Sequence, residues 1–262
     1  ISALLPIILF IQSRNGWVKL KKVNLKIHFF RTVLMFFAML AFITSLQHLS
    51  LIIIYSVAFT SPLLLTIGAN LFLGEKVGWR RYMAIIIGFL GVIISLDPFN
   101  ETLNKYIYLA FLAPLFVSIS WLMVKKHGQT ENIYSFLIYG KIFLLIFSGI
   151  FLTTKFTPMN LDDFILNFAS GIIRGIALIF IINSARHLPS SLFAPTQYIQ
   201  IFAGGILGFL MFGDVPTLSN YLGNFLIIGA GIYIIVRELT LSKKSFPLQQ
   251  DQPQFRPEPK NN

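Results

Sequence analysis

Long apolar runs recur along almost the whole chain, and they limit its possible folds more than any other feature. A helix that crosses the hydrocarbon core of a bilayer needs about 20 mainly apolar residues. Eight runs reach roughly that length: 28–48, 50–73, 80–96, 106–124, 132–154, 163–185, 189–211 and 217–236. The opening stretch, 1–11, is apolar but about half as long. The sequence therefore predicts an all-α, polytopic bundle of membrane helices, with the lipid bilayer as its surroundings.

The residue types that are scarce exclude several kinds of chemistry. Only 12% of the residues are charged, against about 25% in soluble domains. The chain has no Cys, which excludes disulfides, thiol catalysis and thiolate metal sites. We therefore expect no cofactor and no metal site. The segment 239–262 lacks apolar periodicity and is rich in Gln, Pro and Lys, so we expect a disordered cytoplasmic tail.

Basic residues alternate between the loops and predict the orientation of the chain. Fifteen Lys and Arg fall in one set of loops and after the last span, and only Lys105 and Lys155 fall in the other set. Cytoplasmic loops carry the excess of Lys and Arg. We therefore expect a multi-pass protein of the cytoplasmic (inner) membrane with its C-terminus in the cytoplasm. The net charge of +11 is explained by orientation, and we expect no nucleic-acid partner.

An internal repeat is visible at a constant offset of 139 residues. The segment LFLGEKVGWRRYMAIIIGFLGVIIS (71–95) aligns with LMFGDVPTLSNYLGNFLIIGAGIYI (210–234), and Gly74 matches Gly213. Glu75 and its counterpart Asp214 fall on opposite sides of the membrane by the charge count, so the repeats are predicted to be inverted. We expect a first repeat over 1–98, incomplete at its N-terminus, and a second over 99–238. Five helices per repeat would require one whole helix and half of another before Ile1.

The same segments resemble a known family. The stretch AFTSPLLLTIGANLFLGEKVGWRRYMAIIIGFLGVI (58–93) is similar to the end of the first EamA repeat of drug/metabolite transporters. The stretch ASGIIRGIALIFIINSARHLPSSLFAPTQYIQIFAGGILGFLMFGDVP (169–216) resembles the second repeat. The resemblance implies ten spans in 5+5 helices and a substrate cavity near the midplane. Its overall pattern is most similar to the branch with bacterial S-adenosylmethionine uptake carriers, although the fold alone names no substrate.

Two cations lie deep inside predicted spans. Arg174 is eleven residues beyond Asp163, about 16 Å along a helix, and Lys141 is about nine residues into its span. Ionisable residues at that depth cost about 2.5–3.5 kcal/mol on insertion scales and indicate a functional site. We expect both to contact a substrate through its carboxylate or phosphate. The alternative is that they bond to freed carbonyls or reach water without touching substrate.

Polar residues on two helix faces are further candidates for substrate binding. Gln197 and Gln200 share one face of the 189–211 span, with Tyr198 beside them. Thr66 and Asn70 form a comparable stripe in the 50–73 span. The alternative for these residues is helix–helix hydrogen bonding, and for Tyr198 an interfacial belt.

Acidic residues and prolines bear on the mode of transport. All ten Asp and Glu lie outside the middle of the apolar spans, which disfavours proton or sodium coupling and leaves His48 and Glu75 as fallback proton carriers. Pro62, Pro114 and Pro195 lie within spans, where each favours a kink.

Taken together, the sequence predicts a carrier of a small organic metabolite that works by alternating access, in facilitated or exchange mode, with S-adenosylmethionine or a related metabolite as a candidate substrate. One alternative is an inactive or decayed transporter fragment. Another is a membrane-embedded lipid-modifying enzyme, which would need a nucleophile beside an oriented base. No such set of side chains occurs at membrane depth, so we expect no catalytic residues and no enzyme activity.

Overall fold

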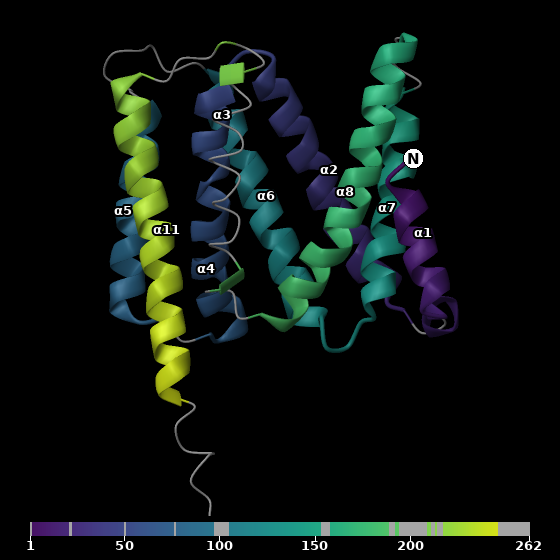
Figure 1. Cartoon of the computed structure of the whole chain (residues 1–262), viewed down its shortest axis with the longest axis horizontal. Helices are drawn as coiled ribbons and strands as arrows, with labels where there is room; N and C mark the ends of the chain where they lie inside the picture. The colour runs from purple at the N-terminus through teal and green to yellow at the C-terminus, as the bar shows by residue number, and fades with distance from the viewer. Residues whose placement is uncertain are drawn as a thin grey trace, which may run out of the picture.

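The protein is a bundle of helices in the computed structural model (Figure 1). The structure describes residues 2–20, 23–49, 51–75, 77–96, 105–152, 158–188, 192–193, 209–210, 213 and 217–245. Within these residues every regular element is helical. The predicted all-α, polytopic bundle is confirmed.

Six membrane-length helices account for six of the eight predicted spans in the described part of the chain. Their bounds are α2 Leu25–Leu46, α3 Leu51–Ala58 continued by α4 Thr60–Leu73, α5 Trp79–Leu96, α6 Lys105–His127, α7 Ile133–Leu152 and α8 Leu161–His187. The last predicted span is α11, Leu218–Ser245, whose apolar part is Leu218–Ile234. The span predicted over 189–211 lies almost wholly outside the described residues.

Shorter elements precede and follow these helices. The opening apolar stretch forms α1, Leu4–Ser13, and a short 3₁₀ helix follows it over Gly16–Leu20. At the other end of the chain α11 continues to Ser245, beyond residue 238, where the sequence places the end of the second repeat.

Pro62 explains why one predicted span is divided into two helices. It lies two residues after the start of α4, and α3 ends four residues before it, at Ala58. A proline has no N–H to donate, and its ring clashes with the carbonyl four residues earlier. The Thr60 hydroxyl instead donates to the Val57 carbonyl oxygen at 2.8 Å. In contrast, α6 continues through Pro114 as a single helix, and Pro195 lies outside the described residues.

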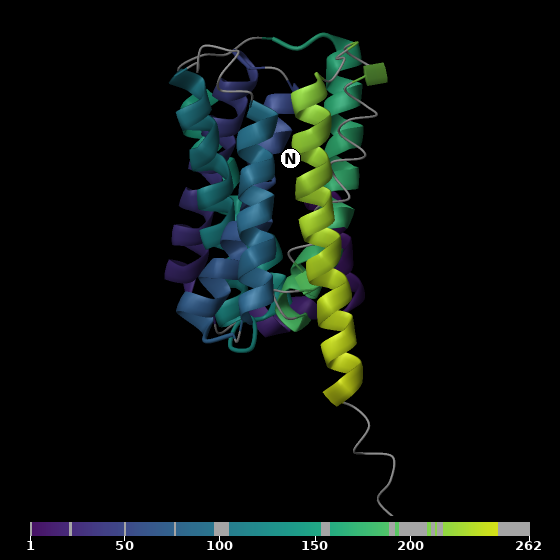
Figure 2. The same ribbon diagram turned by 90° about the vertical axis from the view of Figure 1, so that its left-hand side faces the viewer.

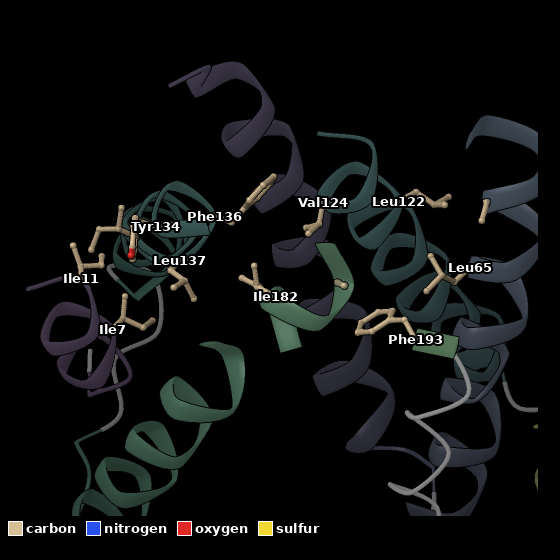
Figure 3. Packing of buried hydrophobic residues seen from close by; sticks show 13 residues of the cluster. Ile7, Ile11, Leu65, Leu122, Val124, Tyr134, Phe136, Leu137, Ile182 and Phe193 are labelled. Carbon is tan, nitrogen blue, oxygen red and sulfur yellow. The ribbon is translucent and has the colours of Figure 1, made fainter. Parts of the chain in front are cut away.

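Two clusters of buried apolar side chains lie within the bundle. One joins α1, α7 and α8 to the ends of α4 and α6, and Figure 3 shows it around Ile7, Leu137 and Ile182. The other lies between α3, α5 and α11, around Val57, Val92 and Ile227. Figures 1 and 2 show α5 and α11 side by side and antiparallel at one edge of the bundle.

Glycine allows α5 and α11 to cross at very short range. A Cβ atom at Gly91 would lie 2.7 Å from the Gly223 carbonyl oxygen, and a Cβ atom at Gly223 would meet the Gly91 carbonyl oxygen. Small residues at helix crossings are how membrane helices gain van der Waals contact. Beside this crossing, the Asn220 side-chain amide donates to the Ser95 carbonyl oxygen at 2.7 Å, and the Ser95 and Ser56 hydroxyls are 2.7 Å apart. The two helices therefore dock through close backbone contact and buried hydrogen bonds.

We predict that Gly91→Leu destabilises the protein by about 1–3 kcal/mol, the usual cost of forcing extra atoms into a filled interior, because the new side chain must push α11 away. Thermal unfolding of the purified protein in detergent measures the effect. Gly229→Leu is the matched control, since Gly229 lies on α11 with no heavy atom within 4 Å of its Cβ position. Equal midpoints for the two variants would contradict the importance of the crossing.

Candidate functional site

Three cations from three helices lie near one another inside the bundle. Lys141 is on α7 and Arg174 on α8, and both line the same hollow. Arg31 of α2 and Arg174 both act electrostatically on the Lys141 ammonium. The two cations predicted from sequence are thus brought together, and the structure adds a third.

The positions of these cations are counted from the end of the bundle where α2 and α7 begin and α8 ends. Arg31 and Lys141 lie nearer that end, and Arg174 lies at the middle of α8. Arg31 lies six residues from the start of α2 and Lys141 eight residues from the start of α7, about 9 Å and 12 Å along the helices. Arg174 lies thirteen residues from either end of α8, about 20 Å.

The hollow beside Lys141 and Arg174 has a volume of about 410 Å³. Binding sites for small molecules usually measure about 300–1,000 Å³. Its polar lining comes from Ser2, Asn167 and Ser170, and its apolar lining includes Phe164. It therefore has room, positive charge and hydrogen-bonding groups for part of a small metabolite.

No carboxylate within the described residues balances this charge. Neither Lys141 nor Arg174 makes an ion pair or a side-chain hydrogen bond with any residue that the structure describes. Arg174 is exposed and Lys141 is partly buried, so a ligand can reach both. Like charges held close together in a low-dielectric setting attract an anion strongly. The chemistry of the hollow is that of an anion site.

Arg31 is the residue that the sequence analysis missed. It was counted with the loop charges that orient the chain, but it lies within α2 and is only 7% exposed. Its guanidinium donates from Nη2 to the Phe136 carbonyl oxygen at 2.9 Å and lies over the Phe136 ring. The sequence contains a signal for this role, a charged residue within an apolar span, because position 31 falls inside the predicted span 28–48.

Thr66 and Asn70 have bonding partners within the fold. The Thr66 hydroxyl donates to the Pro62 carbonyl oxygen one turn earlier, at 2.9 Å. The Asn70 side chain donates to the Glu75 carbonyl oxygen and accepts from the Tyr82 hydroxyl, both at 2.6 Å. Asn70 thereby ties the end of α4 to α5. Neither residue lines the hollow beside Arg174.

The three remaining substrate-binding candidates, Gln197, Tyr198 and Gln200, lie outside the described residues. Of the fallback proton carriers, Glu75 pairs with the Lys125 ammonium at 2.8 Å. His48 stacks on Tyr106, with ring centroids 3.6 Å apart, and its Nδ1 lies 2.9 Å from the Thr44 carbonyl oxygen.

A second cavity, of about 270 Å³, lies between α2, α4 and α6. Its lining is mainly apolar, with Met35, Met39 and Phe42 from α2 and Pro114 from α6. Ser45 and Ser61 also line it, and none of its described lining residues is charged. Among the described residues no cluster of three or more His, Asp and Glu side chains is placed to bind a metal ion.

Comparisons with known proteins agree with this architecture. A protein of known crystal structure superposes on the chain with a TM-score of 0.66 and 13% sequence identity, over 90% of this chain and 86% of that one. The likeness shows a shared fold. A likeness in sequence extends over a similar length: an S-adenosylmethionine uptake transporter of Rickettsia felis is 26% identical over 235 residues, which are 90% of this chain and 79% of that protein.

A riboflavin transporter of Vibrio cholerae is 28% identical over 190 residues, or 71% of this chain and 62% of that protein. The EamA-like transporter family matches residues 1–96 and 104–237, which together are most of the chain. The resemblance seen in the sequence is therefore confirmed, and the lipid-modifying enzyme is set aside. The chain belongs to the EamA-like transporter family and is a multi-pass membrane transporter of small metabolites, not an enzyme.

Proposed function

We propose that this protein carries a small organic metabolite with an anionic group, a carboxylate or a phosphate, across the bacterial cytoplasmic membrane by alternating access. The observation that carries the proposal is the group of three cations, Arg31, Lys141 and Arg174, beside a hollow of about 410 Å³. Cations without a counter-ion are costly within membrane spans. An anionic substrate supplies the counter-ion for as long as it is bound.

Alternating access needs two halves that rock about the site, and inverted repeats would provide them. Two observations support inverted repeats over 1–98 and 99–238. Gly74 and Gly213, which are 139 residues apart, both adopt left-handed backbone conformations, with φ of 68° and 67°. The helices that follow them, α5 and α11, are antiparallel neighbours (Figure 2). Equivalent turns leading into oppositely directed helices are what an inverted repeat requires.

The charge distribution supports an orientation with the C-terminus in the cytoplasm. The loops rich in Lys and Arg join helix ends at the lower end of Figure 1, where α11 also ends. The excess of basic residues marks cytoplasmic loops. In this orientation Arg31 and Lys141 lie nearer the cytoplasm and Arg174 nearer the midplane.

The relatives suggest which metabolite to test first. S-adenosylmethionine bears a carboxylate that Arg174 and Lys141 would bind. A transporter that takes up S-adenosylmethionine is similar to this chain over 90% of the chain's length. We therefore propose S-adenosylmethionine or a related metabolite as substrate. Gln197, Tyr198 and Gln200 remain proposed contacts to the rest of the substrate. Thr66 and Asn70 are proposed to act indirectly, through the shape of α4.

We predict that Arg174→Ala lowers uptake of the transported metabolite at least about tenfold, the effect of losing one charge-assisted contact worth about 1.4 kcal/mol or more. Labelled S-adenosylmethionine, riboflavin and amino acids, supplied to proteoliposomes, identify the substrate and measure the loss. Arg80→Ala is the control, because Arg80 is an exposed arginine at the start of α5. Normal uptake by a correctly inserted Arg174→Ala variant would remove Arg174 from the site.

We also predict that uptake continues when an uncoupler collapses the proton gradient, and that it accelerates when unlabelled substrate is loaded inside the vesicles. Exchange has this signature because each carrier cycle returns with a second substrate molecule. Time courses in proteoliposomes with and without internal substrate measure it. Uptake that stops with the uncoupler and ignores internal substrate would instead indicate ion-driven transport.

A further inference from the structure

A buried pair of ionisable side chains lies at the end of the bundle at which α2 and α7 begin. His28 Nε2 lies 3.3 Å from Glu131 Oε2, and the two side chains are 0% and 8% exposed. His28 lies three residues into α2, and Glu131 lies in the turn between α6 and α7. Neither residue lines the hollow beside Arg174.

Glu131 connects its own turn, between α6 and α7, to the start of α2 and the end of α8 by hydrogen bonds. Its Oε1 accepts from the Asn24 backbone N–H at 3.0 Å, at the residue that caps α2. Its own carbonyl oxygen accepts from Arg186 Nη2 of α8 at 3.0 Å, and Arg186 also donates to the Gly128 carbonyl oxygen at 2.6 Å. The start of α2, the turn between α6 and α7, and the end of α8 are therefore held together here. We call this set of contacts the end latch.

The His28 ring has one nitrogen without a partner. Nδ1 is buried and makes no hydrogen bond, whereas Nε2 faces Glu131. The ring lies edge-on to Phe136, with centroids 5.0 Å apart, and stacks on Tyr139 at 5.7 Å. A neutral imidazole that donates from Nε2 to Glu131 leaves only a lone pair at Nδ1. A protonated ring would place a second N–H among aromatic carbons with no acceptor, which is costly.

Charges of both signs act on the His28 ring. Glu131 faces the ring at 3.3 Å, and Arg31, one turn later on α2, adds a positive charge while only 7% exposed. His127 of α6 also acts on the His28 ring, and Lys141 lies beyond Arg31. A charged His28 would have Glu131 as its counter-ion. What opposes the charge is the burial of the ring and its unpartnered Nδ1, with repulsion from Arg31 and His127 added.

We propose that the His28–Glu131 pair is a proton-binding site whose occupancy releases the end latch. The proton adds to Nδ1 of the imidazole, and no covalent bond between heavy atoms forms or breaks. The resulting cation is stabilised only when water reaches the ring, which requires the start of α2 to move from the turn that holds Glu131. Acid therefore favours the open end. The proton enters and leaves at the same end, so no net proton transport follows.

The absence of Cys from the chain permits a direct test on the purified full-length protein. Thr32→Cys places one thiol on α2, one turn after His28, at a position that is 2% exposed. Ser13→Cys places one at the exposed end of α1. Labelling of both by a small maleimide is measured from about pH 8 to about pH 5.5, the range in which histidine titrates, and the ratio of the two rates removes the effect of pH on the thiol itself.

We expect this ratio to rise on acidification by up to about tenfold per pH unit, the limit for an equilibrium linked to one proton. In the Thr32→Cys background His28→Gln should give a pH-independent ratio, since its side chain does not titrate. Glu131→Gln should raise the ratio already at about pH 8, because it weakens the end latch at any pH. His48→Gln is the matched control and should leave the pH dependence intact, because His48 lies against Tyr106 and the Thr44 carbonyl oxygen and not at the end latch.

A flat ratio in the parent protein, or an unchanged pH dependence in His28→Gln, would overturn the proposal. Each variant is first checked for a single symmetric peak in size-exclusion chromatography, and Glu131→Gln tests the end latch without altering His28. The assay contains no substrate. Its outcome is therefore independent of whether the protein transports the metabolite proposed above.

Discussion

The bilayer withholds water from most of the polypeptide, and this constraint organises the rest of the structure. Backbone groups in hydrocarbon must bond within the chain, so the described residues are helical wherever they are regular. The helices cannot be driven together by hydrophobic burial, because lipid is as apolar as their side chains. They dock instead where backbones approach closely, as at Gly91 and Gly223, and where buried polar groups meet, as at Ser95 and Asn220.

The same constraint makes the few charged side chains within the spans candidates for function. Arg31, Lys141 and Arg174 lie within spans where holding a cation is costly, which supports the proposal that they form a site for an anion. Arg31 is tied to the Phe136 carbonyl oxygen and shapes the site from behind, whereas Lys141 and Arg174 border the open hollow. An anion in the hollow would contact Lys141 and Arg174, which line it, and would have Arg31 at longer range.

The cation site and the end latch are connected through one helix. Arg31 and His28 lie one turn apart on α2, and Phe136 of α7 contacts both side chains. Any movement of α2 at the latch therefore changes the position of Arg31 relative to Lys141. The proposed substrate site and the end latch therefore share α2, as the proposed alternating-access cycle requires.

Periodicity and residue type by themselves determined the membrane spans, the repeat offset and the family. Each of these follows from local patterns in the chain. They also identified Lys141 and Arg174, because a charge in an apolar run is conspicuous. Only the tertiary structure decided which charges meet. Neither Glu131 nor His28 was predicted to be a site residue, and their pairing depends on a contact between residues 103 positions apart. Such contacts depend on how the helices cross one another, and a local sequence pattern does not determine helix crossings.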